Sequence, residues 1–218
     1  MDLPVWQALS DDLAEEAFVV IAVSFDTRAP EASRPWIEGA NPTYPCLLDP
    51  EHEVADLYNM VNVPNAVWID EEGRIVRPAE TAGTGDEFRS MVAPGGIPAD
   101  DLQRMMRRRQ RYVDAVKDWV RNGVDVRSAT DATHTADDAQ AFAHFRFGTW
   151  LARQGRDEEA HAQLAEARRL KPESWAFRRQ SWELEEIGKA GGPDFWAAVE
   201  ALGDADYYPP PQLAGLDD

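Results

Sequence analysis

The sequence is short of cysteine, of basic residues and of long apolar runs. One cysteine, Cys46, in 218 residues excludes an internal disulfide and a zinc site of four cysteines. Forty acidic residues against 22 basic ones give a net charge of −18, so the chain would repel nucleic acid and anionic lipid. No apolar run approaches the roughly 18 residues of a membrane span, and the N-terminus lacks the basic residues of a secretion signal. We therefore expect a soluble, cytoplasmic protein without nucleic-acid or membrane partners.

The apolar content, 44% of the residues, is enough for one large domain or two small ones. The first 80 residues predict the order helix, strand, helix, strand, helix, strand, strand. Residues 18–25 are almost uninterrupted apolar, which predicts a strand covered on both faces of a parallel sheet. The acidic turn at residues 70–73 predicts a hairpin between residues 65–69 and 74–77. An α/β layer arrangement is therefore expected for this part of the chain.

A Gly/Pro-rich stretch at residues 93–98 separates this pattern from a second half with helical periodicity only. That half predicts helices over residues 101–122, 138–154, 157–170 and 173–187, with a short one from Pro193. The sequence thus predicts an α/β domain at 1–92, a linker at 93–100, an all-α domain at 101–203 and an extended tail at 204–218.

Residues 18–26 and the motif Val63–Asp70, followed by the acidic-Gly turn, resemble the thioredoxin-like superfamily. The nearest likeness is to TlpA/ResA-type thiol-disulfide oxidoreductases and their peroxiredoxin relatives, and it covers roughly residues 2–92. The resemblance implies a thioredoxin-like sheet with flanking helices. It also implies a cis Val63–Pro64 bond, with Val63, Pro64 and Asn65 as substrate-binding residues. Without the resemblance, a trans proline opening a strand is the ordinary expectation.

The resemblance further implies a Cys-x-x-Cys motif before the first helix, whose N-terminus would lower the thiol pKa. The sequence has no such motif, so no catalytic residue is assigned and the chain as written is expected to be redox-inactive. The strand that precedes the motif is also missing. We expect that the natural start lies upstream, that a partner or second copy donates a strand, or that the two flanking strands pair directly.

Cys46 is the one thiol left to consider. Flanked by leucine in a short predicted strand, it is expected to be a small packed side chain. The alternative is a lone nucleophile that forms a sulfenic acid or a mixed disulfide. The four histidines show no spacing typical of a metal helix, and no metal or cofactor is predicted.

The second half is similar to one 34-residue tetratricopeptide repeat, in which small residues let two helices approach and a proline ends the second. The matching residues are His144, Phe147, Gly148, Leu151, Ala160, Leu164, Ala167 and Pro172. An ordinary helical hairpin is the alternative. The arginines between Arg104 and Arg111 are expected to be a solvated helix face, with an anionic partner as the alternative.

Three functions remain open from the sequence. The first is a thioredoxin-family protein related to thiol-disulfide oxidoreductases but lacking their dithiol. The second is a non-catalytic protein–protein interaction module that binds a protein or peptide through the thioredoxin fold and the tetratricopeptide-like helices. The third is a redox sensor that uses Cys46.

Overall fold

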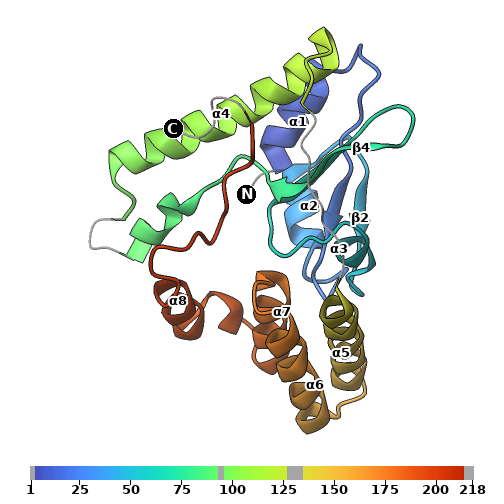
Figure 1. Ribbon diagram of the computed structural model, residues 1–218, viewed down its shortest axis with the longest axis vertical. Coiled ribbons are helices and arrows are strands. Elements are labelled where there is room, and N and C mark those ends of the chain that lie inside the picture. The colour runs from blue at the N-terminus through green and yellow to red at the C-terminus, as the bar shows by residue number, and fades with distance from the viewer. Residues whose placement is uncertain (1–2, 93–95, 127–134, 214–218) are drawn as a thin grey trace. The chain divides into compact units, whose positions relative to one another are not determined.

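The computed structural model describes residues 3–92, 96–126 and 135–213 (Figure 1). Its helices and strands are, in chain order, α1 (Leu3–Asp12), β1 (Ala22–Ser24), α2 (Arg34–Ala40), β2 (Cys46–Leu48), α3 (Glu53–Leu57), β3 (Asn65–Ile69), β4 (Ile75–Thr81), η1 (Asp86–Val92), α4 (Ala99–Asn122), α5 (Ala136–Arg153), α6 (Asp157–Leu170), α7 (Trp175–Glu185), η2 (Lys189–Gly191) and α8 (Pro193–Glu200). Expected linker residues 93–95, loop residues 128–134 and tail residues 214–218 lie outside the described residues.

The chain forms two compact units that alternate along the sequence. Unit 1 contains Met1–Val20, Pro64–Thr130 and Leu202–Asp218, and unit 2 contains Ile21–Val63 and Asp131–Ala201. This division differs from the expected boundary at residues 93–100. The difference arises because α4 packs with the β3–β4 hairpin, whereas α5 to α7 pack with the segment that carries β1 and α3.

Unit 1 is built on the predicted hairpin, in which β3 pairs antiparallel with β4 and Asn65 lies opposite Thr81. Helices α1 and α4 supply the rest of its core, which includes Leu9, Leu13, Trp68, Val76, Tyr112, Val113 and Val116. Gly83, just after β4, has a φ of +66°, and a β-carbon there would lie 3.3 Å from the α-carbon of Arg109. The backbone of α4 therefore approaches the end of the hairpin closely.

The tail that follows α8 is fixed onto unit 1 by charged side chains that bind its backbone. Asp86 accepts hydrogen bonds from the amides of Tyr207 and Tyr208, at 2.9 and 2.7 Å. Arg89 donates to the carbonyl oxygens of Gly203 and Ala205. Tyr207 is buried, so the tail is an ordered part of this unit up to residue 213.

Unit 2 combines a two-stranded parallel sheet with helices α2, α3 and α5 to α8. β1 pairs with β2, with Ala22 opposite Cys46. The core contains Phe25, Ala55, Ala141, Phe142, Phe145, Leu164, Ala167 and Phe177. His52 is the residue directly before α3, and the carboxylate of Asp49 binds the first turn of this helix, accepting hydrogen bonds from the amides of Glu53 and Val54 at 2.8 Å each.

The pair α5 and α6 forms the predicted helical hairpin (Figure 1). Gly148 lets the helices meet, since a β-carbon at this position would lie 2.8 Å from Cγ of Leu164. The hairpin is tied at one end by Lys171, whose buried ammonium pairs with Asp138 of α5 and donates to Asn59 at 2.9 Å. Close helix approach at this glycine is therefore confirmed.

The expectation that residues 18–25 form a strand covered on both faces is wrong. The segment 18–25 forms strand only at Ala22–Ser24, and Val19 and Ile21 are more than half exposed instead of covered on both faces. In the described part of the chain, β1 has β2 as its neighbour and β3 has β4, which makes two separate two-stranded sheets. The apolar side chains of residues 18–25 are therefore not buried on both faces by these two-stranded sheets.

The expected cis bond at Val63–Pro64 is also wrong, since the cis peptide in the described residues is Ala29–Pro30. An X–Pro bond is trans unless tertiary contacts favour the cis isomer by more than about 0.5–1 kcal/mol. Pro64 leads straight into β3, and its carbonyl oxygen accepts a hydrogen bond from the amide of Ala82 at 3.1 Å. The trans proline at the start of a strand, the ordinary expectation, describes this residue.

Candidate functional site

The thiol of Cys46 lies in β2 and is partly exposed. Burial raises the pKa of this thiol above its usual value. The pKa of the nearby Tyr44 phenol rises to about 12, first through burial and then through the negative charge that Cys46 would carry. A thiol with a raised pKa is a poor nucleophile at neutral pH, because the thiolate is the reactive form. The geometry therefore agrees with a packing role for Cys46.

The three expected substrate-binding residues are divided between the two units. Val63 is partly exposed in unit 2, and its amide donates to Oδ1 of Asn62 at 2.9 Å. Pro64 and Asn65 belong to unit 1, where Asn65 begins β3. Their role in binding a substrate chain stays a prediction.

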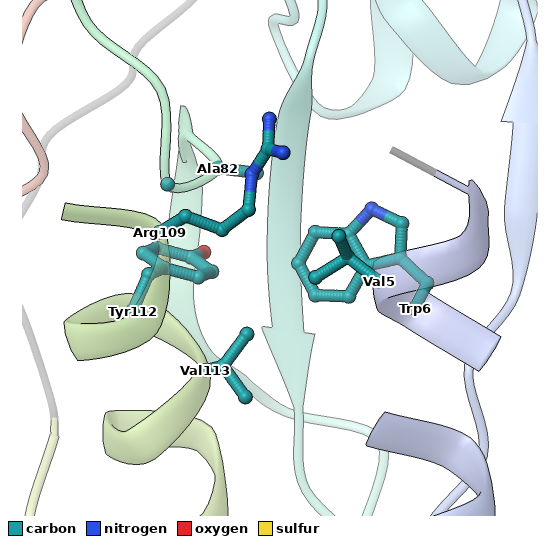
Figure 2. Close-up of a pocket in the computed structure, with 7 residues that line it drawn as sticks. Val5, Trp6, Ala82, Arg109, Tyr112 and Val113 are labelled. Carbon is teal, nitrogen blue, oxygen red and sulfur yellow. The ribbon is translucent and has the colours of Figure 1, made fainter. Parts of the chain in front are cut away.

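Unit 1 contains a small pocket between α1, the end of β4 and α4 (Figure 2). Figure 2 shows Val5 and Trp6 of α1 on one side and Arg109, Tyr112 and Val113 of α4 on the other. The rings of Trp6 and Tyr112 meet edge to face, with centroids 6.3 Å apart. The free space is about that of one water molecule, so this pocket is too small for a peptide or a drug-sized ligand.

A buried polar network lies behind this pocket. The indole nitrogen of Trp68 donates to the hydroxyl of Tyr112 at 2.8 Å, and that hydroxyl lies 3.2 Å from Oε1 of Glu80. Burial, followed by the charge of Glu80, raises the pKa of Tyr112 well above its usual value. Glu80 also pairs with Arg77, which donates to the carbonyl oxygens of Val126 and Gln212. The Tyr112 hydroxyl therefore stays protonated and Arg77 is bound to backbone carbonyl oxygens, so we interpret this network as structural.

His52, which the sequence pattern did not mark as a functional residue, is a fully buried histidine of unit 2. Its ring is fully buried among Phe25, Phe145 and Phe177. Nδ1 has no hydrogen-bond partner among the described residues. Burial lowers the pKa of His52 from 6.5 to about 4, so the ring is neutral at pH 7. Its burial depends on phenylalanines from distant segments, so no local sequence signal could have found it.

No group of three or more histidine, cysteine, aspartate or glutamate side chains in residues 3–92, 96–126 and 135–213 is arranged to hold a metal ion. Within the same ranges, none of the helices combines the length and the apolar character needed to cross a membrane.

Comparison with known proteins gives one match. Residues 2–77, roughly a third of the chain, match the AhpC/TSA family. Neither the curated proteins nor the solved structures include a match to the chain. The matched part contains α1, β1 to β3 and the first residues of β4, which are the elements on which the thioredoxin-like resemblance was based. Residues 2–77 are therefore similar to the AhpC/TSA family, a thioredoxin-like family, and a helix-rich part follows them.

Proposed function

We propose that these 218 residues are a redox-inactive relative of the AhpC/TSA proteins that acts by binding other polypeptides. The observation that carries this proposal is the state of Cys46, the sole thiol. Burial raises its pKa, and it lies in the short strand β2 and not at the start of a helix. AhpC/TSA-type chemistry needs an activated thiolate, which this environment does not favour.

The second part of the proposal rests on the helix-rich region. A tetratricopeptide-like arrangement of the unit 2 helices, with the α5–α6 hairpin as its repeat, would give a surface for protein recognition. Large apolar side chains that are exposed on unit 2 support this use. They include Leu57 and Ile187.

Thiol chemistry is tested by the rate at which a maleimide alkylates Cys46 as the pH is raised. We expect the rate to rise with an inflection above the ordinary pKa of a thiol, because burial raises the pKa of Cys46, and we expect no reduction of insulin or hydrogen peroxide above the rate of the buffer. The variant Cys46→Ser should behave like the parent in both activity assays. An inflection below pH 7, or peroxide reduction that Cys46→Ser abolishes, would overturn the proposal.

The binding role is tested by comparing the partners captured by the chain and by Cys46→Ser. The same partners, eluted without reductant from both, would support binding that does not use the thiol. Partners that are captured only by the parent and released by dithiothreitol would show mixed-disulfide exchange, and the sensor hypothesis would replace this one.

A further inference from the structure

Helix α5 presents apolar side chains on two opposite sides. One side packs into unit 2 through Ala141, Phe142, Phe145 and Leu151. On the opposite side, Phe147 is 48% exposed and Trp150 is 47% exposed. The rings of these two residues stack on each other, with centroids 6.0 Å apart and planes at 16°. A helix that is apolar on both sides is typical of one that is covered on both.

The middle of the exposed side of α5 is uncharged, and the exposed Asp137 and Arg153 lie at its two edges. It follows the helical spacing of three and four residues and consists of Ala136, Ala139, Gln140, Ala143, Phe147, Trp150 and Gln154, here called the α5 stripe. In a chain with 28% charged residues, seven uncharged exposed positions along one face of a helix mark a special surface. Two copies of a chain with net charge −18 repel each other, so an uncharged face is where they can meet.

The basic residues beside the α5 stripe are already neutralised. Arg146 pairs with Asp56 at 3.0 Å, and Arg153 pairs with Glu51. Both carboxylates belong to the segment around α3, in the same unit. A second copy that lies on the stripe therefore leaves no unpaired arginine at this edge.

The side chains of the α5 stripe are small at one end of the helix and large at the other. Alanines occupy its N-terminal half, and Phe147 and Trp150 occupy its C-terminal half. Two such stripes fit when they run antiparallel about residue 145, because Phe147 then lies opposite Ala143 of the other copy and Trp150 opposite Gln140. A parallel arrangement would place the aromatic side chains against each other and leave the alanines apart. The same patch on both copies is the property of a two-fold interface.

We propose that the α5 stripe is a dimer interface at which a second copy of this chain packs its own α5 antiparallel. One helix face buries less than the roughly 800 Å² per partner of a standard interface, so the dimer is reversible and concentration-dependent. Its association strengthens as salt is added, since salt screens the repulsion between the two acidic copies. An interface made of ion pairs would weaken instead. This inference does not depend on the proposed redox inactivity.

Sedimentation equilibrium on the full chain, over a hundredfold range of concentration, tests the proposal. We expect the mass to rise from one copy to two, and Trp150→Glu to weaken the association at least tenfold. Trp36→Glu is the matched control, because Trp36 on α2 is 60% exposed and lies outside the stripe. Ala143→Arg is a second variant that keeps the aromatic pair and favours helix. A monomer at every concentration, or equal weakening by Trp36→Glu, would overturn the proposal.

The orientation is tested separately with spin labels on cysteines placed in a Cys46→Ser background. In the antiparallel dimer, labels at residue 154 are separated along the helix by about 27 Å, and labels at residue 143 by about 6 Å. A clearly longer distance for Gln154→Cys than for Ala143→Cys is the expected result. Equal short distances would show a parallel pair and contradict the proposal. A mass of one copy that rises only with a basic helical peptide would point to a partner of another kind and overturn it as well.

Discussion

Nε2 of His52 donates a hydrogen bond of 2.6 Å to the carbonyl oxygen of Phe25. The carbonyl oxygen can only accept, so the proton of the neutral ring lies on Nε2 and Nδ1 is left as the bare nitrogen. The bond joins the residue before α3 to the residue after β1. It also explains the tautomer of a histidine that has no second partner among the described residues.

This histidine predicts how stability changes between pH 7 and pH 4. Because burial lowers the pKa of His52 from 6.5 to about 4, the unfolded chain binds the proton more tightly than the folded chain. The stabilisation is therefore complete above pH 6.5 and is lost as the pH falls toward 4, by up to about 3 kcal/mol. Urea unfolding at pH 5 and pH 7 measures it. His52→Gln, which does not titrate, should show a shallower pH dependence, and an equal slope would assign the effect to other groups.

We expect alanine substitutions at Gly148 and at Gly39, both in helices, to change the free energy of unfolding in opposite directions. A β-carbon at Gly148 would meet Leu164 at 2.8 Å and the carbonyl oxygen of Ala160 at 3.2 Å, whereas Gly39 in α2 has no heavy atom within 4 Å. We expect Gly39→Ala to stabilise by about 0.5–1 kcal/mol and Gly148→Ala to destabilise by about 1–3 kcal/mol. Urea unfolding of both variants tests this. Stabilisation by both would mean that α5 and α6 approach less closely.

The sequence predicted well what depends on neighbours in the chain. The hairpin followed from the turn at residues 70–73, and helix α6 has the expected bounds, because acidic first-turn residues and Gly155 mark its start. The predicted burial of residues 18–25 failed, since cover for a strand comes from distant segments that the pattern does not specify. The two interleaved units and the role of His52 were missed for the same reason.

We expect a large loss of stability when Lys171 alone is substituted. Its ammonium is buried, pairs with Asp138 and donates to Asn59 at 2.9 Å. Burial alone would raise the pKa of Asp138, but the hydrogen bonds from Lys171 and Thr135 lower it to about 2. Lys171→Met leaves a buried carboxylate unpaired and should cost about 3–5 kcal/mol.

The control is Arg169→Met, which removes an exposed ion pair with Glu166 from the same helix. It should change the free energy of unfolding by less than about 1 kcal/mol. Similar losses in the two variants would mean that the Lys171 pair contributes no more than a surface pair. The double variant Lys171→Met with Asp138→Leu should recover part of the loss, because no buried charge then remains.

Because Asp86 binds the backbone of the tail, we expect that substituting it releases the tail without unfolding unit 1. Its two carboxylate oxygens bind the amides of Tyr207 and Tyr208, and each hydrogen bond to a charged group contributes about 1.5–3 kcal/mol. In Asp86→Ala we expect amide exchange over residues 203–213 to become at least tenfold faster, while exchange in α4 stays unchanged. Arg89→Met should act on the same segment, because it removes the bonds to the carbonyl oxygens of Gly203 and Ala205. Hydrogen exchange followed by mass spectrometry measures both, with the exposed Asp100→Ala as control. Unchanged protection in both variants would mean that burial of Tyr207 and Leu213 alone holds the tail in place.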